Sequence, residues 1–443
     1  MAISGLAGKN YRLIILCVSV IFLNGCVQKS QKKYYDNSDI LFKLNNTLSE
    51  AIIYDGFSPP VASRIYAYCN IAANEALCVS ANQNGSVIQK LNGFEKNNYK
   101  YENELNDTIV LITAFCEVAK KLVYRGYLID SIQTELMQRF SGNLANETIL
   151  NSTVAGKDIF TQINKRIATD NYGKTRNMPK FVPSGKEGSW KPTAPMYADG
   201  LEPYWGTIMP FFLDSASQFQ VDAGEKFSIE KTSAFYKQNL EVYELVNKNS
   251  QENLDVALFW DCNPLRTNVT GHLSFKTRQL NPGGHWLEIA NDVCKVEKKD
   301  LFTSSFICAM VSIAVADGFI VCWKEKFRLN TIRPETYIQL YIDKDWKPLL
   351  ETPPFPELPS GHSTISAAAA NVLEHFYGKN FSYIDSTEVP FGMQPRHFNS
   401  FIEAAKQAAV SRLYGGIHYH HACDEGYKLG EKVSGVLLTK ITN

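Results

Sequence analysis

The 443-residue chain has no excess of charge of either sign. Lys and Arg together number 45, and Asp and Glu together also number 45, so the formal net charge is zero. Such a chain does not attract nucleic acid or an acidic surface through bulk electrostatics, and any anion that it binds must be held by a local site. We therefore expect no nucleic-acid partner.

The sequence also lacks the paired cysteine spacing of a zinc site, although it contains 10 cysteines. Two of them, Cys17 and Cys26, lie near the N-terminus, and the other eight are scattered without metal-ligand spacing. Several lie in apolar runs, as Cys308 does, where a free thiol is usually buried. This distribution disfavours a zinc site and leaves the connectivity of any disulfides open.

Apolar runs of membrane-spanning length are not apparent either. The run from Leu13 to Leu23 follows Lys9 and Arg12, and it is well short of the roughly 20 apolar residues that a spanning helix needs. A short apolar run behind positive charges is typical of a signal peptide. We expect no later stretch to be apolar enough to cross a membrane.

The signal-like segment ends in Leu23-Asn24-Gly25-Cys26, which resembles the cleavage box of bacterial lipoproteins. The resemblance implies that residues 1–25 are removed and that lipid is attached to the thiol of Cys26. The alternative is an ordinary secretory signal with an incidental cysteine. Residues 26–38 are polar and rich in Lys, which predicts a flexible tether. We therefore expect an exported lipoprotein anchored to a bacterial membrane, facing the periplasm or the cell surface.

Strand signals are scarce, and helical periodicity dominates the rest of the sequence. The pattern predicts an all-α fold with long ordered loops. We divide it into an N-terminal helical part, 39–250, and a C-terminal helical bundle, 251–443. The helical segments expected in the first part are 40–53, 61–81, 103–125, 128–144, 153–169 and about 224–246, and a loop rich in Gly, Pro, Trp and Tyr is expected over 172–206.

Three short segments in the C-terminal third concentrate cationic side chains and backbone donors. The first runs from Lys326 to Arg333 and is followed at once by Pro334. On a helix, seven residues are about two turns, so the two cations are expected on one face. Pro334 disfavours continuation of that helix.

The second segment is Pro359-Ser360-Gly361-His362, ahead of an Ala-rich stretch, 363–376, that is expected to be helical. Pro and Ser suit a helix start. Gly361 lets an anion approach the bare amide, toward which the positive end of the helix dipole points. His362 would then stand beside the anion, where an imidazole can exchange a proton near neutral pH.

The third segment is Ser411-Arg412, followed after five residues by His418. A helix over 401–412 is expected to deliver a third cation. Gly415-Gly416 is expected to break the helix and turn the chain so that His418 points back. Arg suits bidentate binding of an oxyanion, whereas Lys supplies a point charge.

Each segment alone is more often structural than functional, but the three together fix ten residues in order. At about one chance in twenty for each residue, coincidence is negligible. The three blocks resemble the signature of the superfamily that unites vanadium-dependent haloperoxidases, acid phosphatases and type 2 phosphatidic acid phosphatases, whose fold is a helical bundle. Residues 58–68 and 259–261 also resemble segments of bacterial haloperoxidase-like members.

The resemblance implies a role for each matched residue. His418 would be the axial group, either the vanadium ligand of a peroxidase or the nucleophile of a phosphatase. His362 would be the acid and base. The oxygens of vanadate or phosphate would be neutralised by Lys326, Arg333, Ser360, Gly361 and Arg412.

Of the chemistries in this superfamily, we favour a vanadate-dependent haloperoxidase that oxidises halide, most readily iodide, with hydrogen peroxide. The absence of accompanying membrane helices disfavours an integral lipid phosphatase, and Trp323 and Phe355 would form an aromatic pocket for a weakly hydrated halide. The alternative for both aromatics is simple core packing. An exported acid phosphatase that works through a phosphohistidine, or a non-catalytic oxyanion-binding lipoprotein, stays open at this point, as do the organic acceptor and the number of subunits.

One departure from the family pattern concerns the residue that orients His418. Many relatives have a carboxylate four residues after this histidine, where the present chain has Ala422. Asp424 or Glu425 is the candidate substitute. His420 and His421 are expected to be solvated surface residues, and a structural role is favoured for the nearby candidates Asp261, His285 and Trp286.

Overall fold

The computed structural model describes residues 38–80, 86–95, 99–140, 142–264, 267–270, 273–276 and 279–442. The predicted signal peptide, Cys26 and all but the last residue of the predicted tether lie outside the described residues. Those assignments stay predictions.

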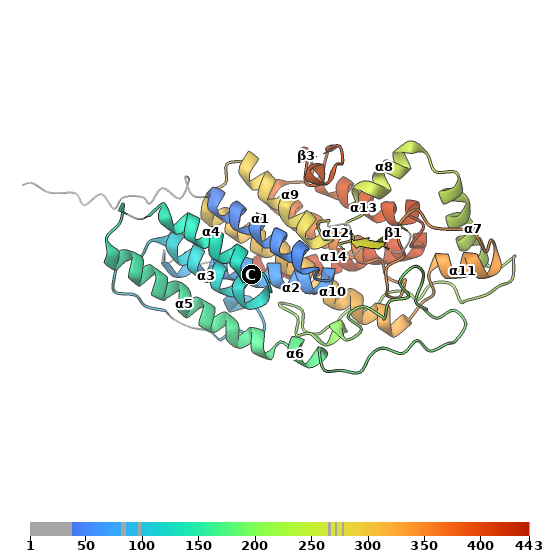
Figure 1. The fold of residues 1–443 in the computed structure, drawn as a ribbon, viewed down its shortest axis with the longest axis horizontal. Coiled ribbons are helices and arrows are strands. Elements are labelled where there is room, and N and C mark those ends of the chain that lie inside the picture. The colour runs from blue at the N-terminus through green and yellow to red at the C-terminus, as the bar shows by residue number, and fades with distance from the viewer. Residues whose placement is uncertain are drawn as a thin grey trace, which may run out of the picture. The chain divides into compact units, whose positions relative to one another are not determined.

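The N-terminal part consists of helices that confirm the predicted segments, except that the fourth helix ends at residue 138 rather than 144 and the fifth begins at residue 146 rather than 153. Amphipathic periodicity places one face of each helix in the core, and the side chain of Asn106 caps α3 by accepting from the Ile109 amide at 3.1 Å. In Figure 1 these helices lie side by side, coloured blue to teal. They are α1 (Ser38–Asp55), α2 (Pro59–Ser80), α3 (Asp107–Leu122), α4 (Gly126–Gln138) and α5 (Asn146–Thr169), with a short 3₁₀ turn, η2 (Val87–Lys90), after α2.

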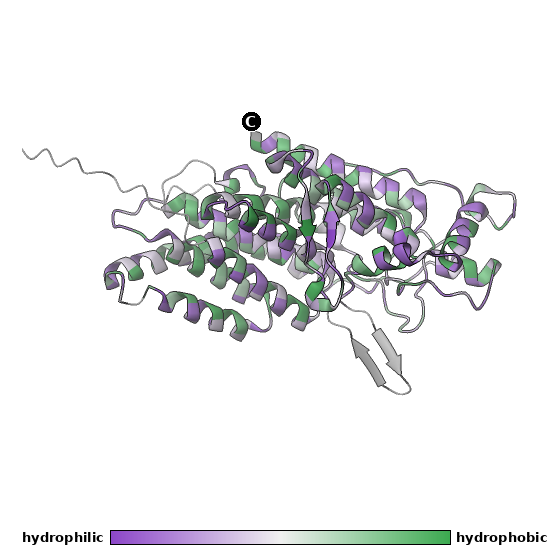
Figure 2. Ribbon diagram, turned by 90° about the horizontal axis from the view of Figure 1, so that it is seen from above, coloured by the Kyte–Doolittle hydropathy of each residue, from purple (hydrophilic) through white to green (hydrophobic). Residues whose placement is uncertain are grey.

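The C-terminal part is also helical, so the predicted all-α class is confirmed. The boundary expected near residue 251 between the two parts stays a prediction. Figure 2 shows hydrophilic and hydrophobic residues alternating along the helices, as expected when one face of each is buried. Helix α7 (Ala234–Asn247) ends the N-terminal part. The helices of the C-terminal part are α8 (Gln251–Phe259), α9 (Pro282–Val296), α10 (Leu301–Leu329), α11 (Pro334–Tyr341), α12 (Gly361–Tyr377), α13 (Phe401–Tyr414) and α14 (His420–Thr442).

Two short antiparallel hairpins accompany the helices. In one, β1 (Thr267–Thr270) pairs with β2 (Leu273–Lys276), and in the other, β3 (Tyr383–Asp385) pairs with β4 (Arg396–Phe398). Strands of three or four residues are too short to produce a clear alternating pattern, so the sequence did not predict them.

Helix α10 lies at the centre of the molecule and packs against α2, α9, α12 and α14. By length and composition α10 is apolar enough to cross a membrane. The prediction that no stretch after the signal-like segment is apolar enough to do so was therefore wrong. In the structure, 94% of its most apolar window is buried among other helices. Within the described residues this helix is therefore the core of a helical bundle, which satisfies the same hydrophobic pattern as a membrane span.

A long segment without regular structure crosses the bundle between α5 and α7. The predicted loop over 172–206 is confirmed, interrupted only by α6 (Tyr172–Thr175) and η3 (Trp205–Thr207). Further along, the buried carboxylate of Asp317 on α10 accepts hydrogen bonds from the amides of Phe211, Phe212 and Leu213 at 2.7–3.1 Å. These bonds fix the segment on α10 and supply partners that a buried carboxylate requires.

The helix expected from Gly224 starts ten residues later than predicted. Residues 224–233 lack helical structure, and α7 begins at Ala234 after the N-cap Ser233, whose hydroxyl accepts from the Tyr236 amide at 3.1 Å. The Ser-capped start satisfies an amide that a longer helix would have bonded internally.

Helices α12 and α14 approach each other closely because α14 presents glycines to α12. A Cβ at Gly426 would lie 2.5 Å from the Ser360 carbonyl oxygen, and one at Gly430 would overlap the Thr364 carbonyl oxygen. The first turn of α12 is therefore held against α14 with no room for a methyl group.

We expect Gly430→Ala to lower the free energy of unfolding by about 1–3 kcal/mol, because α14 must move away from α12 to accommodate the methyl group. Thermal unfolding measures the change. Gly435→Ala on the same helix is the matched control: nothing lies within 4 Å of its Cβ position, so this variant should be neutral or slightly stabilising. Equal melting temperatures for both variants would contradict the packing argument.

Candidate active site

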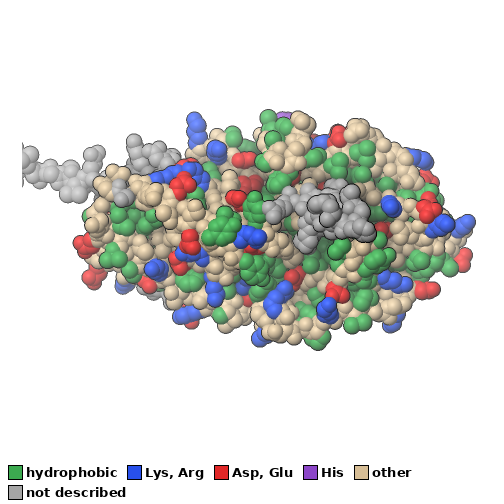
Figure 3. Space-filling model, in the orientation of Figure 1, with side chains coloured by type: hydrophobic (Ala, Val, Ile, Leu, Met, Phe, Trp, Pro, Cys, Tyr) green, Lys and Arg blue, Asp and Glu red, His purple; other side chains and the backbone are tan. Residues whose placement is uncertain are grey.

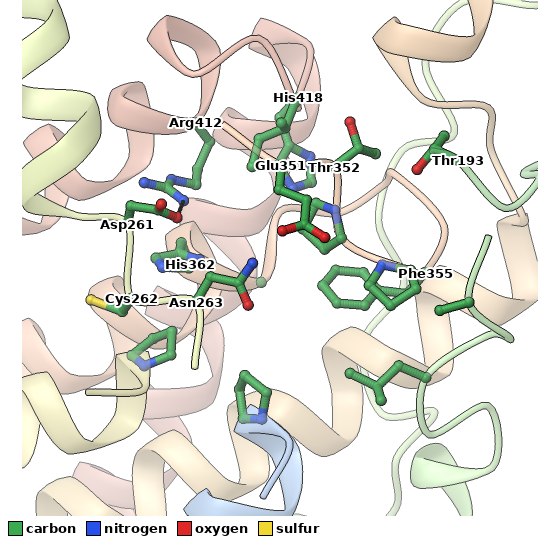
Figure 4. Close-up of a pocket in the computed structure, with 18 of the residues that line it drawn as sticks. Thr193, Asp261, Cys262, Asn263, Glu351, Thr352, Phe355, His362, Arg412 and His418 are labelled. Carbon is green, nitrogen blue, oxygen red and sulfur yellow. Dashed lines mark ion pairs between the residues drawn. The ribbon is translucent and has the colours of Figure 1, made fainter. Parts of the chain in front are cut away.

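The second and third motifs line a cavity of about 200 Å³, and the two cations of the first motif, Lys326 and Arg333, lie behind its wall against the lining residue Phe355. Its wall is built from the start of α12, the loop before that helix, the end of α13 and the loop after it, the loop after α8, and segment 193–201. Figure 4 shows Arg412, His362 and His418 facing this cavity from different elements, with Phe355 on the opposite side. Residues almost 100 positions apart in the sequence thus share one pocket.

Lys326 lies fully buried near the end of α10. Its Nζ donates to the carbonyl oxygens of Pro356 and Glu357, both at 3.0 Å, and to that of Pro359. Burial lowers the pKa of Lys326 to about 7, but three acceptors around one nitrogen can be satisfied only by the ammonium. The geometry therefore favours a charged lysine, fixed by the loop that precedes α12.

Arg333 contacts the lining residues His418 and Phe355, but not from the face of α10 as predicted. That helix ends at Leu329, and Asn330 adopts the left-handed conformation with φ of 53°. Pro334 does not end a helix here; it is the first residue of α11, where its missing amide costs nothing. Arg333 is therefore an N-cap residue on a loop, and its approach to Lys326 depends on the turn rather than on helical spacing.

The guanidinium of Arg333 is fully buried and incompletely paired. Its Nε donates to the Phe355 carbonyl oxygen at 2.9 Å, and one terminal nitrogen donates to the Ile417 carbonyl oxygen at 2.7 Å. The other terminal nitrogen has no partner among the described residues. Burial lowers the pKa of Arg333 to about 10, so the group stays charged at neutral pH and keeps one buried donor for an anion.

Arg412 comes from the last turn of α13, as the sequence predicted. Its Nε donates to the Ser411 hydroxyl at 3.0 Å, and a terminal nitrogen donates to the Trp260 carbonyl oxygen at 2.8 Å. The nearest carboxylate contact is with Asp261, at 4.0 Å from the other terminal nitrogen. Most of its fixing bonds are thus to neutral oxygens, and its charge is only partly offset.

Ser360 and Gly361 form the start of α12, in agreement with the prediction. Ser360 is the N-cap, and its hydroxyl accepts from the Ser363 amide at 3.3 Å. A Cβ at Gly361 would lie 3.3 Å from the ring of Trp323. A side chain at this position would therefore crowd the wall of the cavity just where the helix presents its positive end.

His418 points back into the cavity after the turn at Gly415-Gly416, where Gly416 has φ of 75°. Its Nδ1 lies 2.8 Å from a carboxylate oxygen of Glu357, and its Nε2 lies 3.2 Å from a terminal nitrogen of Arg333. Nδ1–H therefore donates to Glu357, and Nε2 carries the lone pair. Burial, and secondly the charge of Arg333, hold the pKa of His418 well below its usual range.

The carboxylate that orients His418 is therefore Glu357, and neither Asp424 nor Glu425 occupies that position. Glu425 instead accepts from the Asp222 amide at 2.9 Å and pairs with Lys428. Sequence reasoning missed Glu357 because it searched downstream of the histidine. The available signal was an acidic residue in Pro356-Glu357-Leu358-Pro359, immediately before the anion-binding helix.

His362 stands in the first turn of α12 and lines the cavity. Its Nε2 has no partner among the described residues. Burial, followed by the charge of Arg412, holds its pKa well below the usual range, whereas a hydrogen bond to the backbone of Trp260 acts in the opposite direction. His362 is therefore a neutral imidazole with one ring nitrogen available to a molecule in the cavity.

Trp323 and Phe355 both line the cavity, with ring centroids 4.8 Å apart. Lys326 Nζ lies 5.0 Å from the centre of the Phe355 ring, and Arg333 lies at the same distance. The aromatic wall thus packs directly on two of the cations, which lowers the polarity around them and stabilises them through the ring faces. The location predicted for these two residues agrees with the structure.

The other residues that the sequence singled out lie in the cavity wall, at the surface or in the core. Asp261 lines the cavity, and His420 is exposed, as expected. His421 is only partly exposed, and its Nε2 lies 3.0 Å from the Asp222 carbonyl oxygen. Trp286 is buried and donates to the Ser366 hydroxyl at 2.8 Å, so the structural role favoured for it agrees with its surroundings.

The site as a whole is suited to a tetrahedral oxyanion. Lys326, Arg333 and Arg412 place three buried cations around one cavity, and the free nitrogens of Arg333 and His362 are orphaned polar atoms that an anion would satisfy. The unprotonated Nε2 of His418 would be the protein ligand to vanadate. The site therefore fits vanadate, because it offers positive charge, a glycine amide at a helix start and one neutral imidazole.

Comparison with solved structures identifies the family. The chain is 40% identical to a bacterial vanadium-dependent iodoperoxidase, with a TM-score of 0.85 over 91% of this chain and 96% of that one. The chain belongs to the vanadium-dependent haloperoxidases. Residues 341–443 match the model of the VCPO second helical-bundle domain. A holo-type bacterial vanadium-dependent chloroperoxidase, at 14% identity and a TM-score of 0.64 over 88% and 95% of the two chains, shares the fold. A search of the curated proteins found no significant match.

We expect Glu357→Leu to weaken vanadate binding about 10–100-fold, because removing the partner of Nδ1 leaves the ring of this haloperoxidase's His418 free to rotate and to change tautomer. Equilibrium dialysis with vanadate measures the affinity. Glu357→Gln keeps an acceptor and should lose less. Glu425→Gln is the matched control and should bind as the native protein does; an unchanged affinity in folded Glu357→Leu would refute the role of Glu357.

Proposed function

We propose that this haloperoxidase uses vanadate and hydrogen peroxide to oxidise halide, and that iodide is its preferred halide. The observation that carries the proposal is the grouping of three buried cations, Arg412 in the cavity wall and Lys326 and Arg333 directly behind it, around a neutral His418. A site of this charge would neutralise bound vanadate, with His418 as its protein ligand.

The protein residues hold the cofactor through complementary contacts. Lys326, Arg333 and Arg412 would neutralise its oxygens, together with the Ser360 hydroxyl and the Gly361 amide, and His418 Nε2 would be the axial ligand. Bound vanadate supplies a Lewis acid that activates hydrogen peroxide without a change in its own oxidation state.

His362 is the residue placed to move a proton. Its Nε2 faces the cavity without a partner, and its lowered pKa keeps that nitrogen unprotonated at neutral pH. An unprotonated imidazole accepts the proton that hydrogen peroxide loses on activation, and the resulting imidazolium returns it to the product. Arg412, which disfavours this imidazolium electrostatically, promotes the return.

Two observations support iodide as the preferred halide. The cavity wall beside the cations is aromatic, formed by Trp323 and Phe355, and such a wall favours a large, weakly hydrated anion over a strongly hydrated one. The relative with 40% identity is named as an iodoperoxidase. Iodide is also the most easily oxidised of the halides in question.

The phosphatase alternative has one observation in its favour, a neutral His418 in the cavity wall whose Nε2 contacts Arg333 at 3.2 Å and could attack a phosphoryl group as well as bind vanadium. A paired assay separates the two activities. We expect vanadate-loaded protein to oxidise iodide in the presence of peroxide and to hydrolyse a generic phosphate monoester weakly. His418→Ala should abolish iodide oxidation, since it removes the axial ligand.

His420→Ala is the control for that variant, because His420 is an exposed neighbour on α14 that does not line the cavity. It should keep native activity. Full activity in His418→Ala, or strong hydrolysis inhibited by vanadate without iodide oxidation, would overturn the proposed function.

We also propose that the protein is exported and held at a membrane by lipid on Cys26. The support is the order of charges, apolar run and cysteine at the N-terminus. Cys26→Ser should move the protein from the detergent phase to the aqueous phase in detergent partitioning. An unchanged distribution would refute lipid attachment at this residue.

A further inference from the structure

A second cluster of potential ligands lies beside the cavity. Cys262 follows α8, His285 lies in the first turn of α9, and Glu388 precedes the 3₁₀ turn η4 (Val389–Phe391). The Sγ–Nδ1 distance is 3.3 Å, the Nδ1–Oε1 distance is 3.1 Å and the Sγ–Oε1 distance is 3.7 Å. All three side chains are buried. In the sequence, His285 lies 23 residues and Glu388 lies 126 residues after Cys262. No short spacing in the sequence therefore predicts the cluster.

The orientation of His285 is fixed by its other ring nitrogen. Nε2 lies 2.8 Å from an oxygen of Asp385 and 2.7 Å from the hydroxyl of Thr387. The ring also stacks on Trp260, with centroids 4.6 Å apart. Nε2–H therefore donates to the carboxylate, and Nδ1 points its lone pair toward Cys262 and Glu388. A carboxylate behind a histidine is the arrangement that orients and strengthens imidazole ligands of metal ions.

We propose that Cys262, His285 and Glu388 bind one divalent transition-metal ion of the Zn²⁺ type, at a site separate from that of vanadate. Tetrahedral Zn²⁺ with usual bond lengths holds S and N ligands about 3.6 Å apart, N and O about 3.3 Å and S and O about 3.5 Å. The three observed separations each lie within a few tenths of an ångström of these values. The ion therefore fits without rearrangement of the backbone.

The charges of the surroundings also suit a dication. Glu388 and Asp385 supply two carboxylates, and the thiol of Cys262 becomes a third negative group when it binds the ion. Burial raises the pKa of Cys262 to about 11, so binding must displace the thiol proton to solvent. Arg412, which also lines the cavity, acts on the thiol electrostatically, and the three negative groups together offset both it and the ion.

The cavity provides the entry path and the fourth ligand position. Cys262 is itself part of the cavity wall, whereas His285 and Glu388 lie behind it. Figure 4 shows Cys262 next to Asp261 and close to His362. Three protein ligands with one side open to a water-accessible cavity leave a position for water or a small solute.

A different account explains the cluster without a metal. His285 Nδ1 and the Glu388 oxygen lie 3.1 Å apart, and their lone pairs would repel each other unless a positive charge lies between them. A proton can supply that charge as well as a metal ion can. His285 would then be an imidazolium between Asp385 and Glu388. This agrees with the pKa of His285, which Asp385 and Cys262 raise well above its usual range. The metal and the proton compete for one position, so measurement of binding decides between them.

The test is titration of the purified, reduced full-length protein with Co²⁺ and Zn²⁺, without vanadate, peroxide or halide. We expect one Co²⁺ per chain, with the thiolate-to-cobalt charge-transfer absorption of a tetrahedral site, and displacement of Co²⁺ by one equivalent of Zn²⁺. Cys262→Ser should lose the charge-transfer band. Asp385→Asn should weaken Co²⁺ affinity about 10–100-fold while keeping the band at saturation.

Cys78→Ser is the matched control, because Cys78 is a buried thiol on α2 whose side-chain contact is with Asn74 rather than a histidine. It should bind Co²⁺ as the native protein does. Absence of stoichiometric binding, or an undiminished band in Cys262→Ser, would overturn the metal site and leave the imidazolium account. Neither outcome depends on haloperoxidase activity, so the proposed function is tested independently.

Discussion

The contact between buried cations and backbone carbonyl oxygens is the interaction on which the site depends. Lys326 donates to three carbonyl groups, and Arg333 and Arg412 each donate to carbonyl groups from separate loops. Carbonyl dipoles offset the cost of burying charge without cancelling it, whereas a carboxylate in contact with each cation would neutralise the site. The residual positive charge is what an entering oxyanion meets.

The Pro-rich loop before α12 makes those carbonyl groups available. Proline cannot donate a backbone hydrogen bond, and the residue before proline is driven away from helical geometry. The carbonyl oxygens of Phe355, Pro356, Glu357 and Pro359 are consequently not used in helix or sheet and can accept from side chains. The same segment contributes Phe355 to the aromatic wall and Glu357 to His418, so one loop sets the polarity, charge and tautomer of the site.

Helix positions and the three motifs could be predicted from the sequence because they are local. Hydrophobic periodicity predicted the positions of α2 and α12. The N-cap Ser360 could be predicted because its hydroxyl bonds an amide only three residues away. The path from Lys326 to Arg333 could not be predicted from helical spacing, since Asn330 turns the chain by adopting a conformation that most residues avoid.

The long-range contacts of the site lie beyond what the sequence shows. Glu357 reaches His418 across 61 residues, and the cluster around His285 joins three separate segments. Composition alone likewise fails to separate a membrane span from α10, because a helix surrounded on all sides by others needs the same apolar surface as one surrounded by lipid. Contacts between distant segments depend on how the helices pack together. Each local sequence pattern determines only one of the surfaces that meet.

The recognition of the anion by charge and shape has a consequence outside the molecule. Phosphate is also a tetrahedral oxyanion, and nothing in an array of ammonium, guanidinium and amide donors distinguishes phosphorus from vanadium at its centre. Occupancy of the pocket is therefore a competition decided by the relative abundance of the two anions and by the strength of the bond to His418. The concentration of free phosphate around the protein therefore limits how much vanadate the pocket can hold.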